Sequence, residues 1–450
     1  MRIVLFLFFS ILPLFLFGQK KNITLLDNWT DKSLEPSFDG ESIFNECWGW
    51  TKDGQEYAVI GSTAGAHFFK ITYNNKLKLV DFKQGKHYGN DIIHRDFHDC
   101  NGYLYEVSDE GSSSLRIYDL QYLPDSVHII YDSDEFILRS HNIFIDTSSN
   151  LLYSCGNTSN TGMDAVRVIS IADPYHPSLI YDYNFVSYVH DIFVRNDTAY
   201  INAPFDGLLV VDFSTPTMPI PLGALPHYID QGYTHSGWLN QKGDIYVLCD
   251  ENPANRFKVC NVEDVSNIEV LSATKPPTYN ATFPHNVIIK DSLAYFSYYN
   301  DGLQIYDIST PNEPKRIAYY DTYDGDNTGM YRGAWGVYPL LPSGRILISD
   351  RKNGLFLFRH NIPPNINVSN NEFGIYPNPT YGNAYFYYNQ PLNYAYTLTI
   401  YDDRGRLIET YESMEDYLKL NVSHYAKGTY YFQFYSPKND KKLEGKFIKL

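Results

Sequence analysis

Five histidines recur at nearly regular intervals along the middle of the chain, and they are the residues best suited to chemistry. They are His98, His141, His190, His235 and His285. Each opens a short apolar segment, and successive members lie 43 to 50 residues apart. Imidazole binds zinc, copper, iron and nickel, so histidines that repeat in phase predict a candidate metal or ligand site.

A structural interpretation of the same pattern stays open. Trp48 and Trp335 open the corresponding segments at the two ends of the array, and tryptophan suits packing better than coordination. Each histidine could instead make one repeated hydrogen bond between neighbouring units. Side chains alternate along a strand, so the polar residues after the histidines are expected to face the other way and to accept hydrogen bonds from adjacent units. These residues are Asp99, Asn142, Asp191, Ser236 and Asn286.

A second candidate is the loop that contains Asp324, Asp326 and Thr328. These residues alternate before Gly329, as oxygen ligands do at the start of a calcium-binding loop. The glutamate that closes such a loop is missing, because position 335 is Trp335. A calcium site and a solvated turn both remain open, and the cofactor is therefore calcium, a transition metal or none.

The standard catalytic motifs are absent from the sequence, including the GxSxG, HExxH and Walker patterns. The letters His94-Arg95-Asp96 match a kinase tripeptide, but its partner motifs are missing. We therefore expect a non-catalytic binding module. The alternatives are a metal-dependent extracellular enzyme that uses the channel histidines and a metal-stabilised envelope protein.

The histidine segments belong to a larger repeat. Each is followed by three further short strands, such as those at 293–299, 302–308 and 315–320. About seven four-stranded units of this length predict an all-β fold, a seven-bladed β-propeller over residues 22–362. A single four-stranded sheet cannot bury both of its faces, whereas a closed ring of sheets can.

The seventh unit lacks a fourth strand in the repeat region. Pro363 and Pro364 follow its third strand, and proline cannot donate a ladder hydrogen bond. Residues 23–27 resemble the outer strands of the other units. We therefore expect the N-terminal segment to supply the missing outer strand and close the ring.

Two stretches of the repeats, residues 207–219 (GLLVVDFSTPTMP) and 302–314 (GLQIYDISTPNEP), resemble LVIVD repeats. Residues 40–360 resemble the choice-of-anchor B family of exported bacterial propellers. The most specific stretches are residues 190–216 and 333–358. The resemblance implies a surface or extracellular propeller with an attachment device at one end, and it assigns no activity to particular residues.

The N-terminus has the pattern of an export signal over residues 1–18. Arg2 precedes an apolar run that is shorter than the roughly 20 residues of a membrane-spanning helix, and Pro13 interrupts it. We expect cleavage near Gly18 and no membrane span in the mature chain. The five cysteines leave at least one thiol free, with Cys47–Cys100 and Cys249–Cys260 as possible pairs.

The net charge of -16 excludes a general nucleic-acid binder, because neutralising phosphates requires a basic face. An apolar fraction of 44% supplies enough side chains for a core and excludes wholesale disorder. The 41 Tyr and 27 Phe residues favour a sheet-rich protein, because aromatic side chains fill pleated surfaces.

After a linker at 363–370, residues 371–450 have their own strand pattern, which suits a small β-sandwich. The segment resembles the C-terminal sorting domain of the type IX secretion system of Bacteroidetes, with an ordinary adhesive β-domain as the alternative. The matching motif residues are Tyr376, Pro377, Asn378, Pro379, Gly405 and Gly428. The resemblance implies handling by the type IX machinery, passage through the periplasm, and release or attachment at the outer surface. The whole sequence then predicts an exported propeller that binds an extracellular protein or glycan.

Overall fold

The part of the chain described by the computed structural model contains strands and no helix. The described residues are 20–278, 281–325, 331–361, 373–376, 378–388, 395–413, 417–438 and 440–450. The chain divides into two compact units, Met1–Asn361 and Ile362–Leu450, and each is described by itself. The expected export signal at 1–18 lies outside the described residues.

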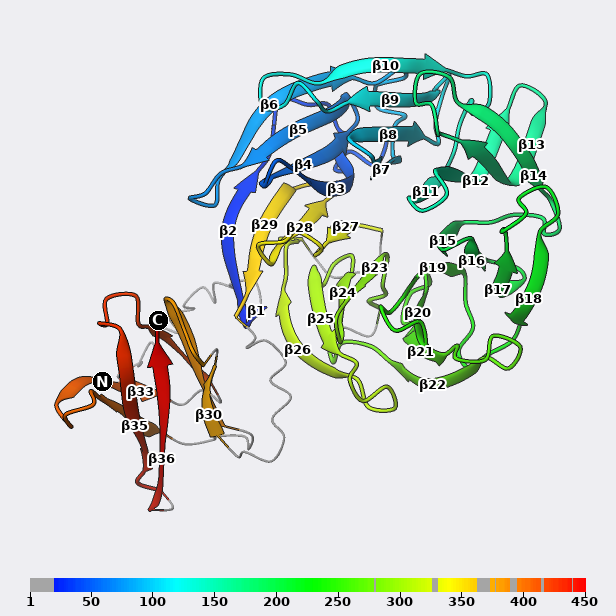
Figure 1. The fold of residues 1–450 in the computed structure, drawn as a ribbon. Helices are drawn as coiled ribbons and strands as arrows, with labels where there is room; N and C mark the ends of the chain where they lie inside the picture. The colour runs from blue at the N-terminus through cyan, green and yellow to red at the C-terminus, as the bar shows by residue number, and fades with distance from the viewer. Residues whose placement is uncertain are drawn as a thin grey trace, which may run out of the picture. The chain divides into compact units, whose positions relative to one another are not determined.

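The described part of the larger unit forms seven antiparallel sheets arranged in a ring (Figure 1). The innermost strands are β3 (Phe44–Lys52), β7 (Arg95–Cys100), β11 (Asn142–Asp146), β15 (Asp191–Arg195), β19 (Thr234–Leu239), β23 (Val287–Lys290) and β27 (Ala334–Tyr338). The second strands are β4 (Gln55–Ser62), β8 (Tyr103–Ser108), β12 (Leu151–Ser159), β16 (Thr198–Ala203), β20 (Ile245–Asp250), β24 (Leu293–Ser297) and β28 (Arg345–Asp350).

The third and outermost strands complete the sheets. The third strands are β5 (Gly65–Ile71), β9 (Leu115–Asp119), β13 (Gly162–Ser170), β17 (Gly207–Asp212), β21 (Phe257–Asn261), β25 (Leu303–Asp307) and β29 (Gly354–His360). The outermost strands are β6 (Leu77–Gln84), β10 (His128–Ser133), β14 (Ser178–Tyr183), β18 (Ile220–Leu225), β22 (Glu269–Thr274), β26 (Lys315–Tyr320) and β2 (Ile23–Trp29). The short strand β1 (Lys20–Lys21), which the repeat does not predict, pairs with the outer edge of β26.

The ring is closed around its axis. Each innermost strand contacts the innermost strand of the next sheet, and β27 of the last sheet contacts β3 of the first. The fold is therefore a β-propeller, as the four-stranded repeat predicts.

Strand β2 supplies the outer strand of the last sheet, which confirms the expectation for the N-terminal segment. It pairs antiparallel with β29, from Ile23 opposite His360 to Trp29 opposite Leu355. Its register shifts between Leu25 and Asp27. The other six sheets have a register shift between the third and the outer strand as well. Strand β2 thus repeats the local geometry of the outer strands that follow it in the chain.

An aspartate of β2 also links the last sheet to the first. The Asp27 carboxylate accepts a hydrogen bond from the backbone N–H of Leu77 at 2.8 Å and one from Lys76 Nζ at 2.8 Å. In the first sheet Asp81 makes the equivalent bond to the N–H of Val127 at 2.8 Å. The junction closed by the N-terminal strand therefore uses the same interaction as the junction after it.

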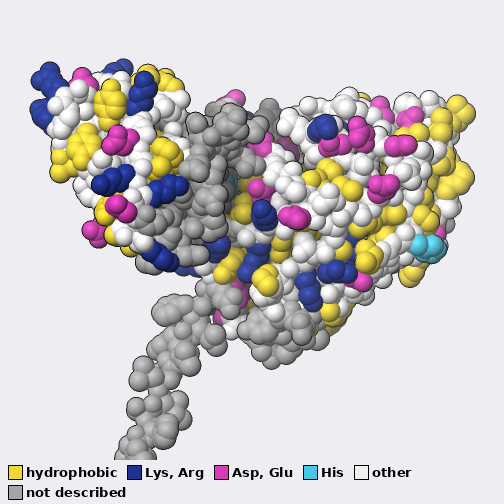
Figure 2. Space-filling model, turned by 90° about the horizontal axis from the view of Figure 1, so that it is seen from below, with side chains coloured by type: hydrophobic (Ala, Val, Ile, Leu, Met, Phe, Trp, Pro, Cys, Tyr) yellow, Lys and Arg dark blue, Asp and Glu magenta, His cyan; other side chains and the backbone are white. Residues whose placement is uncertain are grey.

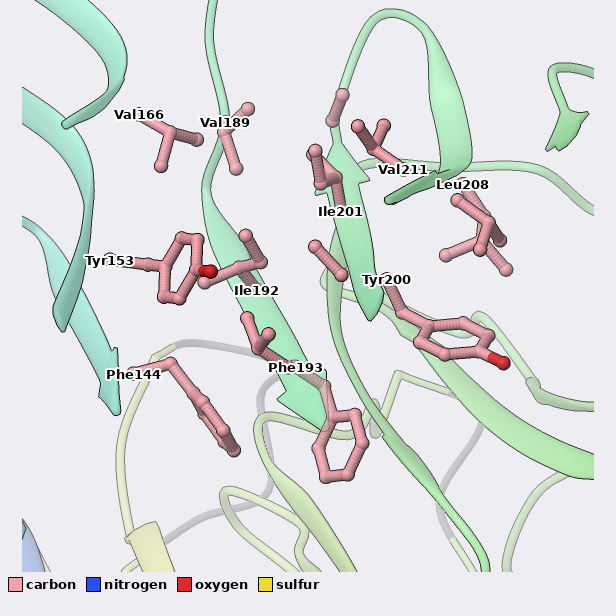
Figure 3. Packing of buried hydrophobic residues seen from close by; sticks show 14 of the residues in the cluster. Phe144, Tyr153, Val166, Val189, Ile192, Phe193, Tyr200, Ile201, Leu208 and Val211 are labelled. Atoms are coloured by element: carbon pink, nitrogen blue, oxygen red, sulfur yellow. The ribbon is translucent and has the colours of Figure 1, made fainter. Parts of the chain in front are cut away.

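Large apolar side chains fill the spaces between adjacent sheets. Figure 3 shows Phe144 and Tyr153 of one sheet packed toward Ile192 and Phe193 of the next. Around the rim, the outermost strands expose part of their apolar side chains, and Figure 2 shows these interspersed with acidic and basic groups on the larger unit, at the right of that view. The core therefore lies between sheets, where burial of both faces stabilises the ring.

The smaller unit is a β-sandwich of two sheets, as expected. One sheet contains β30 (Phe373–Tyr376), β31 (Asn383–Tyr388) and β34 (Tyr417–Asn421). The other contains β33 (Leu407–Ser413), β32 (Tyr396–Tyr401), β35 (Gly428–Ser436) and β36 (Lys441–Lys449). Phe386, Leu398, Phe432 and Phe434 form part of a core that is separate from the propeller core.

The ring junction gives a testable prediction. The substitution Asp27→Ala leaves the buried N–H of Leu77 without its partner, so we expect the free energy of unfolding to fall by about 1–3 kcal/mol. Chemical denaturation of the purified chain measures this change. Glu313→Ala removes an exposed carboxylate and is the control, with an expected change below about 0.5 kcal/mol. Equal effects of the two substitutions would contradict the proposed closure.

Candidate functional site

Four of the five predicted histidines meet at the axis of the propeller. The ring centroids of His141 and His190 are 4.1 Å apart, those of His190 and His235 4.0 Å, and those of His235 and His285 4.7 Å. Trp335 continues the series at 4.0 Å from His285. Histidines from successive sheets are therefore close enough in pairs to share a ligand.

His94 completes this arrangement. Its ring lies 4.9 Å from that of His141 and 5.3 Å from that of Trp335. Six aromatic side chains thus form a closed circle, which we call the histidine ring: His94, His141, His190, His235, His285 and Trp335. The ring lies where the innermost strands begin. His94, His141 and His190 immediately precede these strands, His235 and Trp335 are the second residues of β19 and β27, and His285 lies two residues before β23.

His98, predicted as part of the same candidate site, does not lie with the other four histidines. His98 is opposite Tyr105 in the β7–β8 ladder, as Phe144 is opposite Tyr153 in the next sheet. Its ring contacts Trp48 at 4.4 Å and Phe144 at 4.9 Å, in a second aromatic layer further along the channel. Burial lowers the pKa of His98 to about 4, which keeps it neutral. The spacing of 47 residues from His94 to His141 fits the repeat better than the 43 from His98.

Polar side chains lie between the two aromatic layers, and we call them the polar layer. Its members are Glu46, Asp96, Asn142, Asp191, Ser236 and Asn286. All of them line a cavity of about 50 Å³ toward the second aromatic layer, and all except Ser236 also line one of about 20 Å³ beside the histidine ring. Both volumes admit water, since the polar walls offer several hydrogen-bonding groups.

The polar layer connects separate sheets, in line with the structural interpretation. Ser236 Oγ donates to the backbone oxygen of His285 at 2.6 Å, and Asn286 Nδ2 donates to Glu46 Oε2 at 3.0 Å. Asp99, predicted as a member of this set, instead accepts a hydrogen bond from Trp48 Nε1 at 2.8 Å beside the second aromatic layer.

Three carboxyl groups of the polar layer are buried together, and the nearby His141 lowers the pKa of Asp96 and of Asp191 by less than burial raises it. Burial raises the pKa of Asp96 to about 7 and that of Asp191 to about 8, and Asp96 itself raises the pKa of Asp191 further. Burial and the nearby Asp96 raise the pKa of Glu46 well above its ordinary value. The layer therefore holds protons near neutral pH, because burial penalises each ionised carboxyl.

The imidazoles of the histidine ring have different environments. Burial lowers the pKa values of His190, His235 and His285 well below the ordinary value. Burial also opposes protonation of His141, but the Asp109 carboxylate at 2.9 Å from its Nδ1 outweighs this and raises the pKa. His285 Nδ1 lies 2.6 Å from the backbone oxygen of Trp335, the inter-sheet bond that the structural interpretation expects. Most ring imidazoles are thus neutral, which is the form that binds metals.

The calcium candidates are only partly described. Asp324 forms an ion pair with Lys352 Nζ at 3.0 Å, and this bond lowers the pKa of Asp324. Asp326 and Thr328 lie outside the described residues, so the calcium loop stays a prediction. The five cysteines are all buried and free, and neither Cys47–Cys100 nor Cys249–Cys260 forms a disulfide.

The motif residues of the smaller unit have structural roles at its strand ends. Asn378 Oδ1 accepts a hydrogen bond from the N–H of Ile448 at 2.9 Å, and Asn378 Nδ2 donates to the backbone oxygen of Lys446 at 3.2 Å. Pro379 follows Asn378 directly, and Tyr376 ends β30. Pro377 lies outside the described residues.

Two glycines of the motif occupy backbone conformations that favour glycine. Gly405 has a φ of +74° in the turn closed by Asp402, and Gly428 has a φ of +157° at the start of β35. The described residues of the sorting motif therefore lie at turns and strand ends of one sandwich.

Comparison with known families identifies the smaller unit. Residues 374–449 match the secretion system C-terminal sorting domain. No curated protein matches the chain. This domain directs export through the type IX secretion system, so the protein is handled by that machinery and reaches the cell surface or the medium. Among the described residues no helix has the length and apolar character needed to cross a membrane.

Solved structures resemble the chain in fold. The WD40 repeats of RRP9 are 9% identical, with 76% of this chain and 99% of that chain covered and a TM-score of 0.51. The periplasmic gluconolactonase PpgL of Pseudomonas aeruginosa is 10% identical, with 85% and 100% covered and a TM-score of 0.51. PorZ, a surface component of the type IX secretion system of Porphyromonas gingivalis, is 14% identical at a TM-score of 0.49, with 94% of this chain and 61% of that chain covered. The likenesses to the WD40 repeats and to the gluconolactonase show the propeller fold alone.

The polar layer gives a prediction for pH dependence. Carboxyls whose pKa is raised on folding hold protons that the unfolded chain has released above its ordinary carboxyl pKa of about 4. The buried histidines with lowered pKa values act in the opposite direction below about pH 6.5, where the unfolded chain protonates its histidines. We therefore expect the free energy of unfolding to decrease as the pH rises from about 6.5 through about 7 and 8, the raised pKa values of Asp96 and Asp191. Chemical denaturation between about pH 6.5 and 9 measures this slope.

Two variants test the assignment of this slope. Asp96→Asn replaces a titrating group by an amide of the same shape. We expect the free energy of unfolding of this variant to fall less with rising pH than that of the parent chain, by an amount on the order of 1 kcal/mol. Ser236→Ala changes the same layer without removing a titrating group, and it should lower stability about equally at every pH. A slope that Asp96→Asn leaves unaltered would disprove the assignment.

Proposed function

We propose that the protein is an exported β-propeller that acts as a binding module at the cell surface or in the medium, delivered by the type IX secretion system. In this proposal residues 1–18 are a removed signal, and the repeats belong with the LVIVD and choice-of-anchor B propellers. The sorting domain supports the destination, and the propeller supports a rigid scaffold that presents loops.

The observation that carries the binding role is the set of exposed apolar side chains on one face of the ring. Strands alternate in direction, so the loops that enter the innermost strands share a face with the turns between second and third strands. The histidine ring opens toward this face, which we call the loop face. Its exposed apolar residues are Phe38, Tyr88, Met163, Phe185, Phe205, Ile229 and Tyr331.

One of the most exposed of these side chains, Phe205, lies toward the channel. Phe185 is 71% exposed and Phe205 is 74% exposed, and the ring of Phe205 lies 6.5 Å from that of Tyr233, which in turn contacts His190. Clustered exposed aromatic residues around a polar centre are typical of binding surfaces. We infer that the loop face contacts an extracellular protein or glycan.

The sorting domain gives the first test. A chain truncated after Asn361 retains the whole propeller and loses the smaller unit, so we expect it to remain in the periplasm of a host with a type IX system. Immunoblots of periplasm, cell surface and medium measure its location against that of the full chain. Glu313→Ala in the full chain is the control and should be exported normally. Surface delivery of the truncated chain would contradict the proposed route.

The binding role has its own test. Purified protein is applied to a glycan array and to immobilised mucin and collagen, and we expect binding to at least one of these. The double variant Phe185→Ser and Phe205→Ser should weaken that binding at least about tenfold, as loss of central aromatic contacts does. Tyr73→Ser with Met218→Ser, on turns of the opposite face, is the matched control. Equal weakening by both pairs, or binding to none of the surfaces, would contradict the assignment.

A further inference from the structure

Two groups of side chains, each made of two members of the histidine ring and one neighbouring carboxylate, could each hold a metal ion. One group is His94, Asp109 and His141, and the other is His190, His235 and Glu251. In each group one ligand atom per residue lies within 4.8 Å of the others. The carboxylates come from the turns after β8 and β20, on the loop face. The two groups differ in whether their nitrogen atoms already have partners.

The nitrogens of the first group are partly occupied by carboxylates. His141 Nδ1 lies 2.9 Å from Asp109 Oδ2, and His94 Nδ1 lies 2.5 Å from Glu110 Oε1. These pairs satisfy the imidazoles by hydrogen bonds within the protein. These two nitrogen atoms therefore need no metal ion as a further partner.

The second group has buried nitrogens without hydrogen-bond partners. His235 is 1% exposed, and neither its Nδ1 nor its Nε2 makes a hydrogen bond. The backbone of His285 lies near this ring and favours its protonation, but no hydrogen bond of ordinary geometry forms. His190 is 6% exposed, and the backbone of His235 likewise favours its protonation without a hydrogen bond of ordinary geometry to its Nδ1. A buried polar atom without a partner costs about 1–3 kcal/mol, so a bound ligand would remove a penalty.

The carboxylate of the second group stands at the distance expected for a shared metal. Glu251 Oε2 lies 3.7 Å from His235 Nε2, which is too long for a hydrogen bond. Two ligand atoms on a tetrahedral zinc ion, with bonds of about 2.0–2.1 Å, are separated by roughly 3.4 Å. Tyr299 donates a hydrogen bond to the other oxygen, Oε1, and so fixes the orientation of the carboxylate as outer partners of metal ligands do.

We propose that His190, His235 and Glu251 form a binding site for a divalent transition metal, with Zn²⁺ as the ion that fits best. Two imidazoles and one carboxylate are a ligand set that zinc adopts, and three protein ligands leave one position for water or another ligand. The site lies at the channel opening of the loop face. The observations that support it do not depend on which partner the loop face binds.

The test uses the full chain after export, freed of metal by chelation and dialysed against Zn²⁺ or Co²⁺. Elemental analysis should find one tightly held metal per chain, and Co²⁺ should give the visible absorption of a site of low coordination number. Glu251→Gln keeps an oxygen to accept the Tyr299 hydrogen bond but removes the charge. We expect it to weaken metal affinity by more than the 10–100-fold typical of losing an outer partner.

Asp109→Asn alters the other group and is the matched control, which should retain the metal. Loss of metal in Asp109→Asn with retention in Glu251→Gln would overturn the assignment, as would less than one tightly held metal in the parent chain. Should Glu251→Gln fail to fold, electron paramagnetic resonance of the Cu²⁺-loaded parent chain is compared with that of His94→Asn, which removes one imidazole of the other group. Coupling to two imidazole nitrogens in both chains supports the site, and loss of one coupling in His94→Asn, or fewer than two in the parent chain, refutes it.

Discussion

The antiparallel pairing of β2 with β29 is the interaction on which the geometry of the channel depends. Sheets of a propeller contact only their neighbours, so an open ring could change its curvature by small shifts at each junction. Pairing between residues 23–29 and 355–360 joins the two ends of the array. The same closure brings His94 within 5.3 Å of Trp335, which follows it by 241 residues in the chain. Without it the histidine ring would lack a fixed diameter.

The closed channel is filled by layers of different chemistry. Aromatic rings form two of them, the histidine ring and the layer that contains Trp48, His98 and Phe144. Between them the polar layer buries carboxyls whose raised pKa values show the electrostatic cost of the arrangement. Buried polar groups that do not maximise stability often serve specificity or function. The neutral imidazoles and the carboxylates of the loop face place metal-binding chemistry at the channel opening, beside exposed aromatic residues.

The propeller fold could be predicted from the sequence because each repeated unit has the strand pattern of one four-stranded sheet. Each four-stranded unit has two apolar faces to bury, and the prolines after residue 360 exclude a local fourth strand, so the closing role of β2 could be predicted. The assignment of His98 failed because short apolar segments do not fix strand register. His94 and Asp96 are separated by Arg95, whereas His141 and Asn142 are adjacent, and this extra residue conceals the correct alignment. Glu251 and Asp109 had a usable signal, since each acidic residue directly follows the second strand of its sheet.

Hydrogen exchange of the backbone amides tests the closure most directly. Amides in a structural unit that opens as a whole exchange with one common free energy. The account predicts that the paired amides of β2 are protected to the same degree as those of β28 and β29 and lose protection together with them. Exchange of the β2 amides at the rate of surface loops, while β28 and β29 remain protected, would contradict it.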